Sequence, residues 1–221
     1  MRIDKTINKN ASSLILFFAG WSASPGLFKR MEMDGDSDLW ICYDYRSLIF
    51  NEDMSPYKQV HLVAWSLGVW VADSLFAGKR TFDTATAING TPYPIDDRYG
   101  IPEAIFQGTL AHITEDGMQR FNRRMCGDRD TLAIFSNIPS RPLEEIREEL
   151  QSLHDQVLSA REVAEVISRP NLWDRTIIGT ADKIFPVENL RRYWQGNAAI
   201  IEITAPHLPF YQFKTWNELW D

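Results

Sequence analysis

The stretch Val60-His61-Leu62-Val63-Ala64-Trp65-Ser66-Leu67-Gly68 decides the fold of this chain. An apolar run of the strand type, residues 60–65, leads directly into a serine flanked by small residues, and residues 67–76 continue as a helix. A sharp strand–serine–helix turn is typical of a nucleophile elbow, which exposes the serine at the end of a sheet. The first small residue is Ala64 rather than glycine, and alanine still fits the turn. We therefore expect Ser66 to be a nucleophile.

Other short apolar runs on both sides of this stretch have the composition of strands that are buried on both faces. They are residues 13–18, 39–45, 84–88, 176–178 and 198–203. Helix-like stretches, such as residues 67–76 and 187–194, lie between several of them. Alternating strands and helices predict an α/β protein with a mostly parallel sheet and helices on both faces.

Residues 95–170 break this alternation, because they contain no convincing strand. Residues 102–113 have a helical pattern. A second apolar helix face is formed by Leu143, Ile146, Leu150, Leu153 and Val157. An insert of this size is too long for a plain loop. We expect a helical cap of residues 95–170 over one edge of a core formed by residues 1–94 and 171–221.

A serine hydroxyl needs a general base, and the chain has four histidines. His61 lies inside the strand that leads to Ser66, and His112 and His154 lie on expected cap helices, so packing or surface roles are expected for these three. His207 follows the run 198–203 in a loop, where the carboxyl end of the last strand would place a base. We therefore expect His207 to activate Ser66.

The base in turn needs a carboxylate that orients it and stabilises its charged form. Asp182 follows the run 176–178 in a loop and is our candidate, with Asp96 or Asp97 as the alternative. The order Ser66, Asp182, His207 along the chain is the order found in α/β-hydrolases. The sequence thus predicts an α/β-hydrolase fold with a helical cap insertion.

An oxyanion hole would be formed by two backbone N–H groups. Leu67 follows the nucleophile and would supply the first, and Trp21, in the loop after the run 13–18, would supply the second. The side chains of Trp21 and Trp65 are candidates to line an acyl pocket. No phosphate-binding glycine loop, HExxH or CxxC motif is present, so we expect neither a metal nor a cofactor.

Composition restricts the partners. The net charge of −7 argues against nucleic acid as the main partner, and no apolar run approaches the roughly 20 residues that span a bilayer. The N-terminal residues lack the apolar core of a signal peptide, and the two cysteines are expected to be reduced thiols, so we expect a cytoplasmic protein.

Four segments together resemble the BioG family: Phe-Phe-Ala-Gly-Trp-Ser at 17–22, Ala-Trp-Ser-Leu-Gly-Val-Trp at 64–70, Gly-Thr-Ala-Asp at 179–182 and Pro-His-Leu-Pro-Phe at 206–210. Members of this family are short α/β-hydrolases that act as pimeloyl-[acyl-carrier protein] methyl ester esterases in biotin synthesis. The resemblance implies that Ser66 and His207 are catalytic, with Asp182 as the acid. It also implies an acyl-carrier protein as the partner that carries the substrate.

An acidic carrier protein would need a local basic patch on this acidic chain. Residues 118–130 offer one, because Arg120, Arg123 and Arg124 would share one face of a helix. A solvated face paired with the glutamates of the cap is the competing interpretation, and Lys29-Arg30 or Arg191-Arg192 are alternative patches.

Two other functions remain open on the sequence alone. A thioesterase or a small-ester carboxylesterase would use the same three residues, since all are acyl transfers. A non-catalytic binding protein on a hydrolase fold is a further alternative, which the complete serine, histidine and aspartate set argues against.

Overall fold

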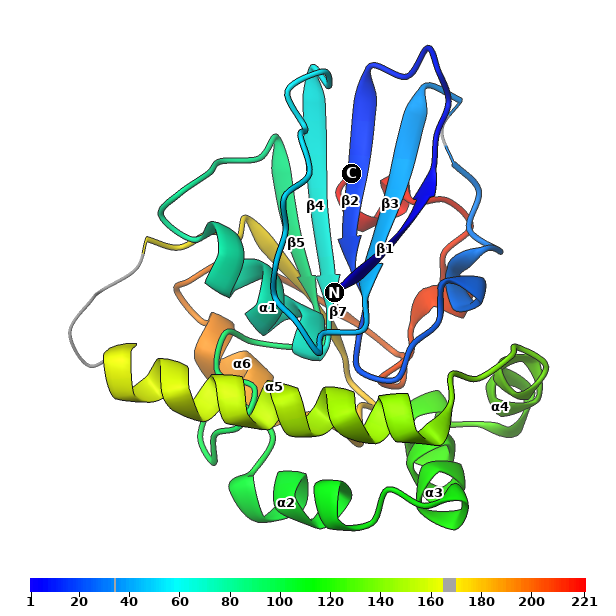
Figure 1. The fold of residues 1–221 in the computed structure, drawn as a ribbon, viewed down its shortest axis with the longest axis vertical. Coiled ribbons are helices and arrows are strands. Elements are labelled where there is room, and N and C mark those ends of the chain that lie inside the picture. The colour runs from blue at the N-terminus through cyan, green and yellow to red at the C-terminus, as the bar shows by residue number, and fades with distance from the viewer. Residues whose placement is uncertain (34, 165–169) are drawn as a thin grey trace.

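The computed structural model describes residues 1–33, 35–164 and 170–221 and is built on a seven-stranded sheet (Figure 1). The strand order is β1-β3-β2-β4-β5-β6-β7. The strands are β1 (Arg2–Thr6), β2 (Ser13–Phe18), β3 (Ser37–Tyr43), β4 (Gln59–Trp65), β5 (Thr84–Ile88), β6 (Arg175–Gly179) and β7 (Ala199–Ile203). All neighbouring pairs are parallel except β1 with β3. The antiparallel edge strand β1 was not predicted, because its residues are polar and largely exposed.

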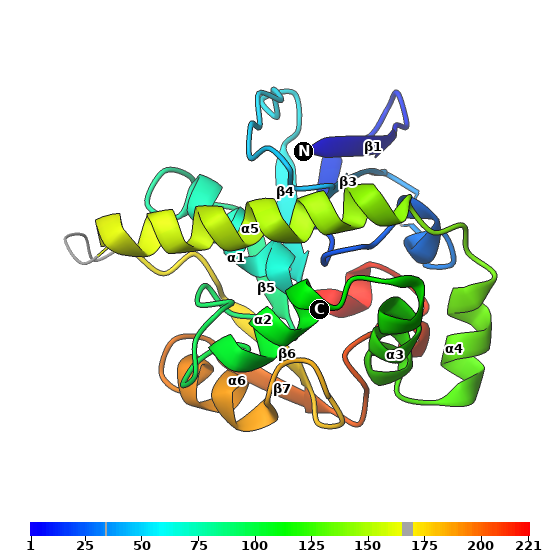
Figure 2. The same ribbon diagram turned by 60° about the horizontal axis from the view of Figure 1, so that its bottom comes forward.

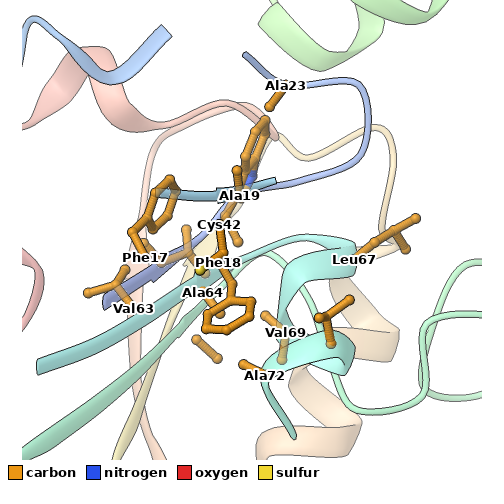
Figure 3. Packing of buried hydrophobic residues seen from close by; sticks show 14 of the residues in the cluster. Phe17, Phe18, Ala19, Ala23, Cys42, Val63, Ala64, Leu67, Val69 and Ala72 are labelled. Carbon is orange, nitrogen blue, oxygen red and sulfur yellow. The ribbon is translucent and has the colours of Figure 1, made fainter. Parts of the chain in front are cut away.

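Successive side chains along β2 point to opposite faces of the sheet. Phe18 points toward helix α1 (Leu67–Phe76), and its ring centroid lies 5.9 Å from that of Phe76 (Figure 3). Phe17 points to the opposite face, where its ring meets those of Phe28, Phe210 and Trp216 at 4.6, 5.5 and 5.0 Å. These aromatic contacts bury both faces of the central strands.

The face that carries α1 also carries α6 (Val187–Trp194). Trp173 joins the two helices, because its ring contacts that of Trp194 and its Nε1 donates to Asp73 on α1. The opposite face is covered by three short 3₁₀ helices, η1 (Pro25–Phe28), η2 (Phe210–Gln212) and η3 (Asn217–Leu219). The predicted α/β architecture with helices on both faces is therefore confirmed, although on the second face these helices are single turns.

Among the residues described between β5 and β6 there are four helices: α2 (Glu103–Ala111), α3 (Glu115–Cys126), α4 (Arg129–Ser136) and α5 (Leu143–Ala164). Helix α5 crosses one end of the sheet, α2 and α3 lie beyond it, and α4 lies beside one end of α5 (Figures 1 and 2). Of the predicted apolar positions of α5, Ile146, Leu150, Leu153 and Val157 are buried, and Leu143 is partly buried. We propose that residues 95–170 form a cap on a core of residues 1–94 and 171–221; residues 165–169, near the end of this cap, lie outside the described part.

The two cysteines, Cys42 and Cys126, are buried and unpaired, as expected. Burial raises the pKa of the Cys126 thiol to about 12, so neither the position nor the chemistry of this group favours reactivity. Within the described parts of the chain, no helix has both the length and the apolar character needed to cross a membrane.

Candidate active site

Ser66 occupies a strained turn between β4 and α1. Its φ is 59° and its ψ is −128°, in the left-handed half of backbone space that residues other than glycine rarely adopt. Tight packing holds the turn there. A Cβ atom added to Gly68 would lie 2.4 Å from the carbonyl oxygen of Phe18, and one added to Gly90 would lie 2.3 Å from that of Ser66. The glycines let the chain pass close enough to present the serine at the end of the sheet.

The structure brings the three predicted residues together. His207 Nε2 lies 2.9 Å from Ser66 Oγ, and His207 Nδ1 lies 2.7 Å from Asp182 Oδ2. All three side chains are buried. Each comes from a loop that directly follows a strand, so the carboxyl edge of the parallel sheet gathers them at one point. This geometry allows proton transfer from the serine to the histidine, with the carboxylate orienting the ring.

The carboxylate of Asp182 is fixed on both of its oxygens. Oδ1 accepts hydrogen bonds from the N–H groups of Ile184 at 2.7 Å and Phe185 at 3.0 Å, while Oδ2 faces His207. The ring of Phe185 also stacks on the imidazole, with centroids 6.0 Å apart and planes 8° apart. An aspartate turn of this kind fixes the orientation of the Asp182 carboxylate before any substrate binds.

The competing candidates lie elsewhere. Asp96 and Asp97 accept hydrogen bonds from backbone N–H groups of their own loop and of the start of α2. His61 lies 2.9 Å from a threonine hydroxyl on β5. The Nδ1 of His112 donates to a carbonyl one turn earlier, and His154 pairs with the adjacent aspartate. None of these contacts involves Ser66, in agreement with the packing and surface roles expected for the three histidines.

The loop after β2 lies directly against the nucleophile. A Cβ atom added to Gly20 would lie 3.0 Å from the Trp65 ring and 3.1 Å from the Cβ of Ser66, so a side chain here would force these neighbours to shift. Trp21 follows Gly20, and Leu67 follows Ser66. Within the described part of the chain, neither the Trp21 nor the Leu67 N–H donates a hydrogen bond. Two N–H groups beside the serine are thus available to an incoming oxygen.

A small, mostly apolar pocket opens over Ser66 and His207. Its remaining lining comprises Trp21, Trp65, Leu67, Ile101, Ile105, Phe106, Thr109, Phe121, Arg124, Met125, Leu150, Lys183 and Ile184. Its volume is about 30 Å³, room for only a few water molecules. Trp21 and Trp65 therefore line the pocket as expected. Among the described residues, no group of three or more histidine, cysteine or acidic side chains is placed to hold a metal ion.

A groove between α2 and α3 lies next to this pocket. Arg120 and Arg123 line the groove but not the pocket, whereas Arg124 lines both. Phe121 and Ile105 also border both. All three arginines are exposed. The groove therefore lies on the cap and shares lining residues with the pocket over Ser66.

The competing interpretation paired this basic patch with the cap glutamates. In the part of the cap that the structure describes, the ion pairs of these glutamates are formed with Arg2, Arg46, Arg141 and Arg147 instead. One alternative patch is less available, because Arg191 pairs with two glutamates. In the other, Arg30 lies over a tyrosine ring.

Sequence reasoning missed one residue that organises the site. Asn89 is fully buried after β5, with a φ of 45°. Its Oδ1 accepts from the N–H of Gly179 at 2.7 Å, and its Nδ2 donates to the carbonyls of Pro206 at 3.1 Å and His207 at 3.0 Å. It thus ties the loops of the acid and the base together. The sequence signal for it is the pair Asn89-Gly90, directly after the run 84–88.

Trp65 has a second role besides lining the pocket. Its Nε1 donates to the carbonyl oxygen of His207 at 2.8 Å, and the two rings lie 5.4 Å apart. The N–H of Leu208 donates to the carbonyl of Met125 on α3 at 3.0 Å. The histidine loop is therefore held from the sheet and from the cap.

Comparison with known proteins gives a consistent result. A family model described as pimeloyl-ACP methyl esterase BioG matches residues 1–219. A crystal structure of BioG from Haemophilus influenzae is 38% identical and superimposes with a TM-score of 0.91 over 100% of both chains. A malonyl-[acyl-carrier protein] O-methyltransferase of Bacteroides fragilis is 42% identical over 184 residues, 82% of this chain but only 36% of that protein.

More distant structures show the fold alone. Human thioesterase 2 is 14% identical, with a TM-score of 0.55 over 91% of this chain and 89% of that one. At this identity the likeness supports the α/β-hydrolase fold and says nothing of the substrate.

Proposed function

The chain belongs to the BioG family of carboxylic ester hydrolases with the α/β-hydrolase fold, and on that premise we propose that it hydrolyses the methyl ester of pimeloyl-[acyl-carrier protein] in biotin synthesis. The observation that carries the proposal is the position of His207, 2.9 Å from Ser66 Oγ and 2.7 Å from Asp182 Oδ2. An ester hydrolase needs a nucleophile, a base and an orienting acid in this relation.

In the proposed mechanism, Ser66 Oγ attacks the ester carbonyl while His207 Nε2 takes the hydroxyl proton. The N–H groups of Trp21 and Leu67 stabilise the oxyanion that forms, and Asp182 stabilises the imidazolium. His207 then gives the proton to the departing methoxide, which leaves as methanol. A water molecule attacks the acyl-enzyme by the same route and releases the free carboxylate and Ser66.

The pocket and the groove support an acyl chain that arrives from outside the protein. The apolar lining suits a methylene chain, and the pocket volume of about 30 Å³ is too small to enclose seven carbons. We propose that the chain runs from Ser66 past Phe121 into the groove between α2 and α3. A phosphopantetheine linker would follow it there. Arg120, Arg123 and Arg124 would then face the acidic carrier protein and offset the net charge of −7.

The Bacteroides relative adds an argument about the substrate. Its name describes methyl transfer to a carboxylate on an acyl-carrier protein, and the part similar to this chain is 36% of its length. An esterase acting on a carrier-bound methyl ester performs the reverse change at the same kind of group. This pairing favours a carrier-bound methyl ester over a free one.

A two-product assay tests the proposal. Purified protein is given methyl pimeloyl-[acyl-carrier protein], and both methanol and free carrier thiol are measured. We expect methanol release with the thioester intact, no reaction with Ser66→Ala, and a normal rate with the control Ser74→Ala at the far end of α1. Release of the carrier thiol would identify a thioesterase instead, and equal rates on free dimethyl pimelate would remove the carrier from the proposal.

A cellular assay complements it. A biotin-requiring strain that lacks its own esterase should grow without biotin when it expresses the wild-type chain, but not when it expresses Ser66→Ala at the same level. Failure of the wild-type chain to restore growth would contradict the assignment to biotin synthesis.

A further inference from the structure

Glu149 is a carboxylate in a place where an apolar side chain is expected. It lies on α5 between the buried residues Ile146 and Leu150, and its own side chain is completely buried. A glutamate is rarely found fully buried unless its charge is compensated. The catalytic residues proposed above do not use it, so its position calls for another explanation.

Three donors converge on this carboxylate. Oε1 accepts from the N–H of Tyr45 at 3.0 Å, and Oε2 accepts from the N–H of Ser22 at 3.3 Å and from Arg141 Nη1 at 2.6 Å. Arg141 is buried as well, and its Nη2 lies 3.1 Å from Asp44 Oδ1. Burial raises the pKa of Glu149 above its ordinary value, while the charge of Arg141 and the N–H groups oppose this rise.

The backbone segments that Glu149 holds are both unusual. Ser22, with φ 65°, follows Trp21 in the loop beside the nucleophile. Asp44, with φ 57°, precedes Tyr45. Left-handed backbone at residues other than glycine costs free energy and persists only where neighbours hold it. Charge-assisted hydrogen bonds from backbone N–H groups to a buried carboxylate can supply that hold.

Helix α5 holds the same loop at a second point. The Nε1 of the Trp21 ring donates to the carbonyl oxygen of Ile146 at 2.8 Å, one turn before Glu149. The loop is therefore fixed through the Trp21 side chain and through the peptide group that joins Trp21 to Ser22. The Trp21 N–H, the proposed oxyanion donor, is the backbone group directly before these two attachments in the chain.

We infer that Glu149, held by Arg141, is a positioning residue that fixes the Trp21 N–H in the oxyanion hole, and that α5 is part of the catalytic apparatus as well as of the cap. This inference rests on the oxyanion hole proposed above. An oxyanion donor is effective only when it is preorganised, and small displacements at such a site cost about 10²-fold in rate. An apolar residue at position 149 would leave the N–H groups of Ser22 and Tyr45 without their acceptor.

The test compares Glu149→Gln with Glu148→Gln. Glu148 is the next residue along α5, its side chain is 51% exposed, and it pairs with Arg46 at the surface. Both changes remove one negative charge. Rates are measured with p-nitrophenyl acetate, which needs no carrier protein, at a temperature well below the Tm of each variant. A trifluoromethyl ketone that adds to Ser66 reports on the oxyanion hole, because its adduct carries the oxyanion.

For Glu149→Gln we expect kcat to fall at least tenfold with KM nearly unchanged. The Ki of the trifluoromethyl ketone should rise by the same factor as kcat/KM falls. The pH at which the rate is half-maximal should stay constant, because His207 and Asp182 are untouched. Glu148→Gln should retain the wild-type kcat and Ki.

A merely structural role gives a different pattern. A lower Tm with unchanged kcat and Ki for Glu149→Gln would overturn the inference, and so would a rise in KM alone. If Glu149→Gln does not fold, Arg141→Lys decides the question. It keeps the charge but loses the forked geometry, so at least a threefold loss of kcat with a parallel rise in Ki is expected, and no loss overturns the inference.

Ser66→Ala separates this inference from the function on which it rests. An active Ser66→Ala would contradict the proposed site itself. An inactive Ser66→Ala together with a fully active Glu149→Gln would leave the site in place and remove only the role of Glu149.

Discussion

The carboxyl edge of the sheet and the helical cap meet at one pocket, yet they position their residues differently. At the sheet edge, short loops hold side chains through the backbone: Ser66 by a left-handed turn, Asp182 by N–H groups of its own loop, and His207 by Asn89. In the cap, long helices reach the pocket through side chains such as Arg124. The sheet edge therefore supplies the chemistry, whereas the cap supplies the lining and the support.

This difference has a measurable consequence. Changes at the sheet edge should affect every ester, because in the proposed mechanism Ser66 attacks every ester. Changes on the outer surface of the cap should affect only substrates long enough to reach it. Experiments that compare a small ester with a carrier-bound ester can therefore test whether the sheet edge and the cap have these different roles.

The largest effect is expected at the sheet edge, for Ser66→Ala and His207→Ala. Each should reduce kcat by about 10⁴-fold or more on both kinds of ester, and the double variant should be little worse than either, because the two residues act as a unit. Circular dichroism and Tm should remain close to the wild type. If the loss of kcat in the double variant equals the product of the two single losses, the residues act independently. That result would contradict the proposed mechanism.

A somewhat smaller loss is expected for Asp182→Asn. The asparagine would place an amide N–H where the structure needs an acceptor, either for His207 or for the N–H groups of Ile184 and Phe185. By analogy with other triads, the loss in kcat should be on the order of 10³- to 10⁴-fold. The matched control is Asp97→Asn, whose carboxylate accepts a hydrogen bond at the start of α2. Full activity of Asp182→Asn would place the acid elsewhere.

The chemistry of the sheet edge could be predicted from the sequence because its signals are local. A buried strand followed by a serine between small residues, or by an aspartate or a histidine in a loop, is visible within about ten residues. The order of the three motifs then fixed the fold class. The polar edge strand β1 carried no such apolar signal and was missed.

The supporting contacts could not be predicted in the same way, because they join distant parts of the chain. Glu149 lies 127 positions from Ser22 and 104 from Tyr45. Asn89 lies 118 positions from His207. The periodicity of α5 correctly predicted its buried face but not what that face contacts. The only local signal was an acid between the apolar positions Ile146 and Leu150.

A moderate effect, restricted to one substrate, is expected on the cap. The double variant Arg120→Glu with Arg123→Glu should lower kcat/KM for the carrier-bound ester more than tenfold, because both arginines line the outer groove. Hydrolysis of p-nitrophenyl acetate should change by less than about twofold. High salt should weaken the wild-type reaction with the carrier in the same way, since it screens exposed charges.

The pair Arg191→Glu with Arg192→Glu on α6 serves as the control for that experiment. Arg191 is already paired with Glu188 and Glu202, so a smaller effect is expected. Equal loss on both substrates in the cap variant would indicate a damaged fold. An effect confined to the α6 variant would move carrier docking to that surface.

The smallest effect on activity is expected at His61. It lies on β4, the strand that ends directly before Ser66, but away from the carboxyl edge of the sheet. Its ring stacks on Trp220 with centroids 4.5 Å apart. Burial lowers the pKa of His61, although the charges of Asp83 and Asp221 act in the opposite direction. The folded protein therefore binds fewer protons at this site than the unfolded chain, and its free energy of unfolding falls as the pH drops through about 6.5.

His61→Gln should remove this dependence while keeping a partner for the Thr84 hydroxyl. Urea unfolding at pH 7 and pH 5 should show a smaller loss of stability for the variant than for the wild type. Esterase activity at pH 8 should stay within about twofold of the wild type. A large loss of activity would show that the sheet contributes to catalysis beyond its carboxyl edge, and the contrast between edge and cap would then be too simple.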